Sequence, residues 1–206
     1  MKGSHHAYQL LALLPVAKFI HSNKRARSLL QDRLTHLCLD FILEPLKKAA
    51  AHGIMMTDSL GYRRHCFTPL VAYIVDTPEA AMLSGVAGKT SPFTLAIYKD
   101  FGDANRHSPR TGENTLSRIK SIAVDPWTDL PAYLSAALSQ RLNGVNEPFW
   151  RDWPRCDPSL FFPPEMLHHW HKYFWDHEAK WCMRAITFAE IDFRFSILHI
   201  PTGYQK

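Results

Sequence analysis

A short apolar run that stops at a helix-starting signal is the feature that most constrains the fold of this chain. Residues 70–75 read Leu-Val-Ala-Tyr-Ile-Val, and Asp76-Thr77-Pro78-Glu79 follows them directly. The run is β-prone and has no charged position, which predicts a strand buried on both faces. An aspartate followed closely by proline is typical of a helix start. A strand that leads straight into a helix indicates an α/β fold.

The composition is that of a globular chain with a moderate positive charge. Of the 206 residues, 46% are hydrophobic and 21% are charged, and the formal net charge is +5. These values exclude a disordered or collagen-like chain. The basic balance suits a polyanionic partner without requiring one. The four cysteines contain no Cys-x-x-Cys pair, so neither a zinc ribbon nor secretion with a disulfide framework is expected.

Residues 8–20 form a second apolar segment close to the start of the sequence. The segment imitates a secretory signal, but Tyr8 and Gln9 interrupt it and leave an apolar core shorter than the roughly 7–15 residues that a signal needs. We therefore predict a buried strand here. No stretch of the sequence approaches the roughly 20 apolar residues of a membrane span, so no membrane partner is expected.

Several further elements follow from the spacing of apolar residues and breakers. A helix is predicted after Ser22 and Asn23, with Pro45 kinking or splitting it and Gly53 ending it. Residues 54–69 read as a hairpin with a turn at 58–61. The positions expected to form the core face of the helix recur at steps of four, three and four: Leu30, Leu34, Leu37 and Phe41.

The periodic signal fades between residues 85 and 163, and a strongly patterned helix follows. We predict a mostly irregular insertion with one or two short helices, the clearest near 129–142. Pro163-Pro164 then opens a helix with one apolar stripe, which we expect to be core. The residues of this stripe are Leu167, Trp170, Phe174, Trp181, Ala185 and Phe188.

Two carboxylates are candidates for metal chemistry. Asp76 ends the apolar run, and Glu165 opens the later helix on a polar face that it shares with His169, Lys172 and Asp176, with His168 at its edge. Carboxylate oxygens are the ligands that Mg²⁺ prefers, and two-metal phosphodiester chemistry needs several of them. Two alternatives stay open: Asp76 as a helix cap with Glu165 complementing a helix start, and a histidine-rich zinc site on the polar face.

Basic residues are candidates for phosphate contact. They occur in the hairpin, in the insertion and beside Trp150 and Trp153, whose rings could stack on bases. A solvated surface explains such residues equally well. The candidates for DNA contact are Arg63, Arg64, Arg106, Arg110 and Arg151.

Three long motifs resemble those of Plavaka transposases, CACTA-like DNA transposases that are abundant in mushroom-forming fungi. They are residues 72–80 (AYIVDTPEA), 141–154 (RLNGVNEPFWRDWP) and 164–172 (PEMLHHWHK). The resemblance spans essentially all of the chain. It implies a DDE/D catalytic core of ribonuclease-H-like fold that cuts and rejoins transposon-end DNA in the nucleus with Mg²⁺ or Mn²⁺.

The resemblance also assigns roles to individual residues. Asp76 matches the second acid of the family, and Glu165 matches the third, one turn before a histidine on a helix. His168, His169 and Lys172 would then support the metal ligands or face DNA. In this interpretation residues 1–84 hold the sheet and helix of a partial core, 85–163 an insertion between the two acids, and 164–206 the helix with the third acid and a C-terminal strand.

Two departures from the family pattern limit what is expected of this chain. The first acid of the family lies upstream of the segment that resembles residues 8–20, and this sequence does not contain it. We therefore expect an internal fragment that is inactive alone, or alternatively a non-catalytic DNA- or protein-binding remnant of a transposable element. Where the wider group often reads Cys-Pro-x-Cys, Ser91 and Thr94 offer no thiolates, so no zinc knuckle is expected.

Overall fold

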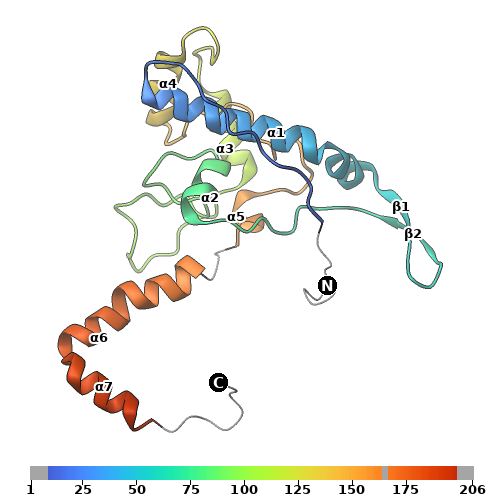
Figure 1. Ribbon diagram of the computed structural model, residues 1–206. Helices are drawn as coiled ribbons and strands as arrows, with labels where there is room; N and C mark the ends of the chain where they lie inside the picture. Colours follow the sequence, from blue (N-terminus) through green and yellow to red (C-terminus); the bar gives the residue numbers. More distant parts are fainter. Residues whose placement is uncertain (1–8, 164–166, 199–206) are drawn as a thin grey trace. The chain divides into compact units, whose positions relative to one another are not determined.

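The structure, a computed structural model, describes residues 9–163 and 167–198, with the backbone alone for residues 167–169. It divides into two compact units, Met1–Pro163 and Pro164–Lys206. Figure 1 shows the elements of each unit.

Helix α1, Lys24–His52, is the longest element of the first unit. It begins as predicted, because the side chain of Asn23 accepts hydrogen bonds from two backbone N–H groups of the first turn. It continues through Pro45 as one helix, so the predicted split does not occur. It ends at Gly53, whose φ of 73° is a left-handed conformation that favours glycine.

The buried face of α1 is not the apolar face that the spacing predicted. Leu37 and Phe41 on the predicted face are 64% and 80% exposed. The helix instead buries a face that carries Arg33, His36 and Lys47. Each of these side chains has hydrogen-bond partners inside the unit, which offsets the cost of removing it from water. The inward face therefore combines these polar side chains with apolar ones, among them Leu29, Leu39 and Leu43.

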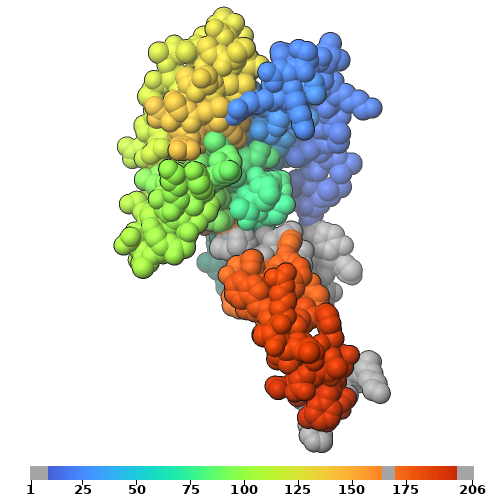
Figure 2. All heavy atoms as spheres, turned by 90° about the vertical axis from the view of Figure 1, so that its left-hand side faces the viewer, coloured from blue at the N-terminus to red at the C-terminus, as the bar shows by residue number. Residues whose placement is uncertain are grey.

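Arg33 joins α1 to the segment around helix α4, Leu130–Ser139. Its guanidinium donates to the carbonyl oxygens of Gly144, at 3.1 and 3.3 Å, and Pro126, at 3.1 Å. Figure 2 shows the two segments side by side, α1 in blue and the region of α4 in yellow. The predicted helix near residues 129–142 is confirmed as α4. Arg33 anchors the segments on either side of this helix to α1.

The predicted hairpin is confirmed. Strands β1, Ile54–Thr57, and β2, Arg63–Cys66, pair antiparallel in a two-stranded sheet. The Asp58 carboxylate closes the turn by accepting backbone N–H groups of Leu60 and Tyr62, at 3.0 and 2.9 Å. This acceptor role explains why an aspartate opens the turn.

The two predicted buried strands do not form in the residues that the structure describes. Residues 70–75 form no strand, and Val71 and Ile74 are 77% and 73% exposed. The described part of residues 8–20 also lacks a strand, and Val16 is 93% exposed. A strand needs neighbours for its backbone groups, and no other strand within 9–163 lies beside either segment.

The core of the first unit lies where α1 meets helix α2, Thr77–Leu83, and the aromatic residues of 149–162. Residues 85–163, expected as a mostly irregular insertion, supply all the phenylalanine and tryptophan residues of this core as well as helices α3, Gly112–Lys120, and α5, Pro158–Phe161. The core residues are Leu39, Leu43, Ala80, Leu83, Phe149, Trp150, Trp153, Cys156, Phe161 and Phe162.

The described residues of the second unit are mostly helical. Two π-helical stretches, η2, Leu167–Lys172, and η3, Trp175–Ala179, lead into α6, Lys180–Ala185. Thr187 then caps α7, Phe188–Ser196. Where a C-terminal strand was expected, the described residues form α7. The apolar stripe expected as core is exposed: Trp170, Phe174, Trp181 and Phe188 are 68%, 60%, 57% and 70% exposed.

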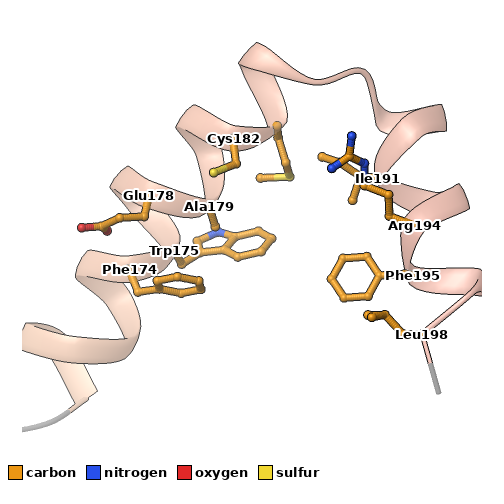
Figure 3. Close-up of a pocket in the computed structure, with 10 residues that line it drawn as sticks. Phe174, Trp175, Glu178, Ala179, Cys182, Ile191, Arg194, Phe195 and Leu198 are labelled. Carbon is orange, nitrogen blue, oxygen red and sulfur yellow. The ribbon is translucent and has the colours of Figure 1, made fainter. Parts of the chain in front are cut away.

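The two helical arms of the second unit enclose an apolar groove of about 420 Å³. Figure 3 shows aromatic side chains on both walls, with Trp175 on one arm and Phe195 on the other. No side chain on the described helices η3, α6 and α7 is buried, although many of them are large and apolar. A helix buries its apolar stripe in most stable folds, so these exposed faces need explanation.

Candidate functional site

Asp76 lies where the extended segment that follows β2 meets helix α2. Its Oδ1 accepts the backbone N–H of Glu79 at 2.9 Å, which makes it the N-cap of α2. The capping role that the sequence left open is therefore present. It does not exclude a metal role, since a carboxylate has about four lone-pair sites and the cap uses one of them.

Glu79 is a second acid at the same helix start, and the sequence analysis did not single it out. Burial raises the pKa of Glu79, and the negative charge of Asp76 raises it further. A carboxylate whose ionisation is opposed by a neighbouring carboxylate is well placed to share a cation with it. The signal that could have identified it is the Asp-x-x-Glu spacing of a capping box.

The segments that lead to Asp76 and Glu165 contact each other inside the first unit. The backbone N–H of Tyr73 donates to the carbonyl of Phe161 at 2.7 Å, and the rings of Tyr73 and Phe162 lie 6.0 Å apart. Figure 1 shows the extended segment passing beside α5 on its way to α2. Asp76 follows Tyr73 by three residues, and Glu165 follows Phe161 by four. The segment before Asp76 therefore contacts helix α5 within the first unit, whereas Glu165 lies outside the described residues.

The remaining residues of the predicted polar face are only partly described. Glu165 lies outside the described residues, as do the side chains of His168 and His169. Lys172 forms an ion pair with Asp176, which also accepts from Lys180 at 2.7 Å. These bonds, that of Lys172 foremost, lower the pKa of Asp176 to about 2. Lys172 is therefore engaged on its own helical arm.

The five arginines predicted to contact DNA differ in their availability. Arg63 and Arg106 are exposed and have no ion pair among the described residues. Arg64 pairs with Asp58 at 3.0 Å, and Arg151 pairs with Asp40 at 2.8 Å. Among these four arginines, two guanidinium groups are therefore without an ion pair in the described residues, and a phosphate would have to displace a carboxylate from the other two.

The predicted DNA contact of Arg110 is corrected by the structure. The Arg110 side chain is only 1% exposed and cannot reach DNA in this structure. Its Nε donates to the Ser91 carbonyl at 2.9 Å, and burial is the main cause that lowers its pKa to about 10. The expected stacking of Trp150 and Trp153 on bases is wrong for the same reason, since they are 1% and 5% exposed. Counting arginines along the sequence does not separate a buried guanidinium from an exposed one.

A polar hollow of about 470 Å³ lies beside helix α3. Three cations line it, Lys120, Arg151 and Arg155. Asp157, also in the lining, accepts the backbone N–H of Gly112 at 2.6 Å. The sequence analysis missed Lys120 and Arg155 because the fold alone brings them to Arg151. Glu113 also lines the hollow, so its three cations stand against two carboxylates.

Comparison with known proteins decides the family. The sequence profile described as Plavaka transposase matches residues 1–182 of this chain. The chain belongs to the Plavaka transposase family. Searches of curated proteins and of solved structures found no match.

The family match covers the positions on which the site depends. The Plavaka transposase match includes Asp76, Glu79 and Glu165, and it ends at residue 182, inside α6. Within 9–163 and 167–198, no helix is long and apolar enough to cross a membrane.

The described residues of this Plavaka chain supply two neighbouring carboxylates, but they contain no group of three or more side chains able to hold a metal ion. That donor set still fits Mg²⁺ or Mn²⁺, because Mg²⁺ sites commonly use one or two carboxylates and complete their shell with water and phosphate. It does not fit a zinc cage of histidines and cysteines.

Proposed function

We propose that this chain is part of the catalytic domain of a cut-and-paste DNA transposase, with a core derived from the ribonuclease-H-like fold. The family match supports the transposase origin. In this proposal Asp76 and Glu165 are the metal-holding acids, and Glu79 assists Asp76. The ligand is Mg²⁺ or Mn²⁺, the macromolecular partner is transposon-end DNA, and the compartment is the nucleus.

The contact between Tyr73 and Phe161 carries the proposal. It joins two segments that are far apart in sequence, one a few residues before Asp76 and the other a few residues before Glu165. A purely structural Asp76 needs only its bond to the Glu79 N–H. The raised pKa of Glu79 adds a second reason, because the helix start holds more negative charge than capping requires.

A bound divalent metal would supply charge stabilisation and an activated oxygen for phosphodiester cleavage. The chain's own groups would hold it through the carboxylates of Asp76, Glu79 and Glu165. Arg63, Arg106 and the cations of the polar hollow would contact the DNA backbone, and Arg64 and Arg151 would join them when released from their carboxylates. The first acid of the family, which would bridge two metal ions, is not among the residues assigned here, so we expect metal binding but no strand transfer by this chain alone.

The proposal predicts that Asp76→Asn weakens Mn²⁺ binding at least tenfold in the purified chain. Asparagine keeps the N-cap but removes the charge, so the loss would report on the metal and not on the helix. The measurement is titration of Mn²⁺ followed by its electron paramagnetic resonance signal, with excess Mg²⁺ as competitor.

Asp129→Asn is the matched control. Asp129 also caps a helix with a proline at its second position, and it accepts the Ala132 N–H at 3.0 Å, but no acid stands three residues after it. Its substitution should leave Mn²⁺ binding unchanged. Equal losses in both variants, or no loss in either, would remove the support for Asp76 as a metal ligand.

A further inference from the structure

We propose that a basic face of the first unit binds the phosphate backbone of double-stranded DNA. The basic face is defined as Arg25, Lys89, Arg118 and Arg141. None of these four residues is an acid of the proposed metal site or lines the polar hollow beside α3. The choice of DNA as the partner rests on the proposed function, whereas the position of the face follows from contacts within the first unit.

Lys89 and Arg141 lie on one surface because their chain segments pair. The backbone N–H of Ala87 donates to the carbonyl oxygen of Arg141 at 2.9 Å, and Lys89 follows Ala87 by two residues. Tyr98 holds the Lys89 segment from its other side, since its backbone N–H donates to the Lys89 carbonyl at 2.9 Å. Two exposed cations that are far apart in the sequence are therefore neighbours in the fold.

Arg118 reaches the same surface from helix α3. Its Nη1 donates to the carbonyl oxygen of Gln140 at 3.5 Å, and Gln140 directly precedes Arg141. Lys120, which lines the polar hollow, follows Arg118 by two residues, and two residues turn an α-helix by about 200°. The basic face and the polar hollow therefore lie on opposite sides of α3.

Arg25 completes the face from the first turn of α1. It lines a hollow of about 180 Å³ together with Gly88, which directly precedes Lys89. Among the described residues that line this hollow, Asp32 is the one acid, and burial raises its pKa to about 6. The hollow therefore joins Arg25 to the segment of Lys89.

The positive charge of the face exceeds the negative charge beside it. Three members of the face are exposed and Arg118 is half-buried. None of the four forms an ion pair with a residue that the structure describes. Two acids lie beside the face: Asp32, and Asp100, whose carboxylate accepts the backbone N–H of Ile97 at 2.9 Å. Four cations therefore stand against two carboxylates, an excess that a polyanion can neutralise.

The backbone supplies independent support, because Lys89 and Arg141 both have a φ of 63°. This left-handed conformation suits glycine, and a residue with a Cβ adopts it at a cost. Among the described residues three non-glycine positions have a positive φ, Lys89, Arg141 and Arg155, and all three are exposed cations. Lysine and arginine are only 24 of the 206 residues, so composition does not explain this coincidence. Backbone strain of this kind concentrates at ligand sites.

Duplex DNA fits a face of this form. It carries one negative charge per roughly 1.7 Å of helix axis, so cations spread over several segments meet several phosphates at once. Ammonium and guanidinium groups contact phosphates without reading base edges, so the face should bind DNA independently of its sequence. A small anion would instead need donors that converge on one point, and the hollow at Arg25 contains the carboxylate of Asp32.

The double variant Lys89→Gln/Arg141→Gln of the full chain tests the face. It removes two phosphate contacts at exposed positions and leaves the acids unaltered. Binding of a labelled random-sequence duplex, followed by fluorescence anisotropy, should weaken at least about tenfold at about 100 mM salt. The slope of log K against log salt concentration should fall by about two, one for each lost contact.

Lys48→Gln/Arg184→Gln is the matched control, because it removes the same charge from exposed positions outside the face. It should bind the duplex like the unmodified chain. An unmodified chain that does not bind the duplex at low salt, or equal losses in the two double variants, would contradict the proposal. Tighter binding of double-stranded RNA of the same length would overturn the choice of DNA.

Mn²⁺ binding separates this inference from the proposed metal site. The Lys89→Gln/Arg141→Gln variant should bind Mn²⁺ like the unmodified chain, because no carboxylate is altered. Loss of DNA binding in this variant supports the basic face even where Asp76→Asn leaves Mn²⁺ binding unchanged, so the two proposals can fail separately.

Arg141→Gly distinguishes a binding role of the side chain from a structural one. Glycine relieves the left-handed backbone, so the midpoint of urea unfolding should not fall, whereas DNA binding should weaken. A lower midpoint would show that the Arg141 side chain supports the fold, and it would contradict the proposal.

Lysine footprinting keeps the test decisive if a variant is unfolded by circular dichroism. In the unmodified chain, bound duplex should protect Lys89 from acetylation several-fold, while the exposed Lys48 should react equally with and without DNA. Equal acetylation of Lys89 in the two conditions would overturn the proposal.

Discussion

His36 is the residue whose buried chemistry most clearly shapes the first unit. Its Nδ1 accepts the backbone N–H of Phe149 at 3.1 Å, and its Nε2 lies 3.3 Å from the carbonyl oxygen of Met82. This pair of bonds needs the neutral ring with a proton on Nε2. Burial is the main cause that lowers the pKa of His36 to about 4.

The stability of the chain should therefore depend on His36 between pH 6.5 and 4. Below the unfolded pKa of about 6.5 the unfolded chain binds a proton that the native ring refuses, so the free energy of unfolding falls as the pH falls, by up to about 3 kcal/mol. Asp32 acts in the opposite direction, since burial raises its pKa to about 6 and the native state then binds the extra proton.

Urea unfolding of the unmodified chain and of His36→Gln at several pH values tests this prediction. Between pH 6.5 and 4, the free energy of unfolding should fall more steeply in the unmodified chain than in His36→Gln. A matched exposed histidine, His21, should give no such difference when replaced by glutamine. Identical pH profiles for His36→Gln and the unmodified chain would contradict this account.

At the scale of elements, the junction between α1 and the hairpin depends on one glycine. Gly53 has a φ of 73°, and a Cβ at this position would lie 2.2 Å from Nε2 of His65. That nitrogen lies 3.1 Å from the carbonyl oxygen of His52, at the end of α1. The glycine therefore allows the end of the helix and strand β2 to approach closely.

Gly53→Ala should destabilise this junction by at least about 1 kcal/mol, from the left-handed backbone and the clash with the imidazole ring. Hydrogen exchange of the β1–β2 amides, read by NMR, would show faster opening. Gly88→Ala is the control, because a Cβ there meets nothing within 4 Å and its φ is not left-handed. Unchanged exchange in Gly53→Ala would show that the ring moves aside without cost.

Short-range signals predicted elements well and their partners poorly. Asn23, Gly53, Asp58 and Asp76 each act through bonds within a few residues, so their roles could be read from the sequence. The apolar spacing of α1 was also real, but which face turned inward depended on partners about a hundred residues away, such as the Arg33 contact with Gly144. Such pairings leave no periodic trace in the sequence.

At the scale of the whole molecule, the motifs identified the family while the expected sheet did not appear among the described residues. The runs at 70–75 and 8–20 have the composition of strands, but a strand is completed by neighbours that local sequence does not supply. The aromatic core of 149–162 was hidden for a different reason. It lies in turns and short helices, where burial follows no fixed period.

The central claim is that Asp76 and Glu165 hold one metal site together. The most direct measurement replaces Mg²⁺ with Fe²⁺ in the purified chain, adds ascorbate and peroxide, and maps the backbone cuts by mass spectrometry. The account predicts cuts near both residues, 76 and 165, that excess Mg²⁺ suppresses and Asp76→Asn abolishes at both places. Cuts near only one of the two acids, or cuts that Asp76→Asn leaves unchanged, would contradict it.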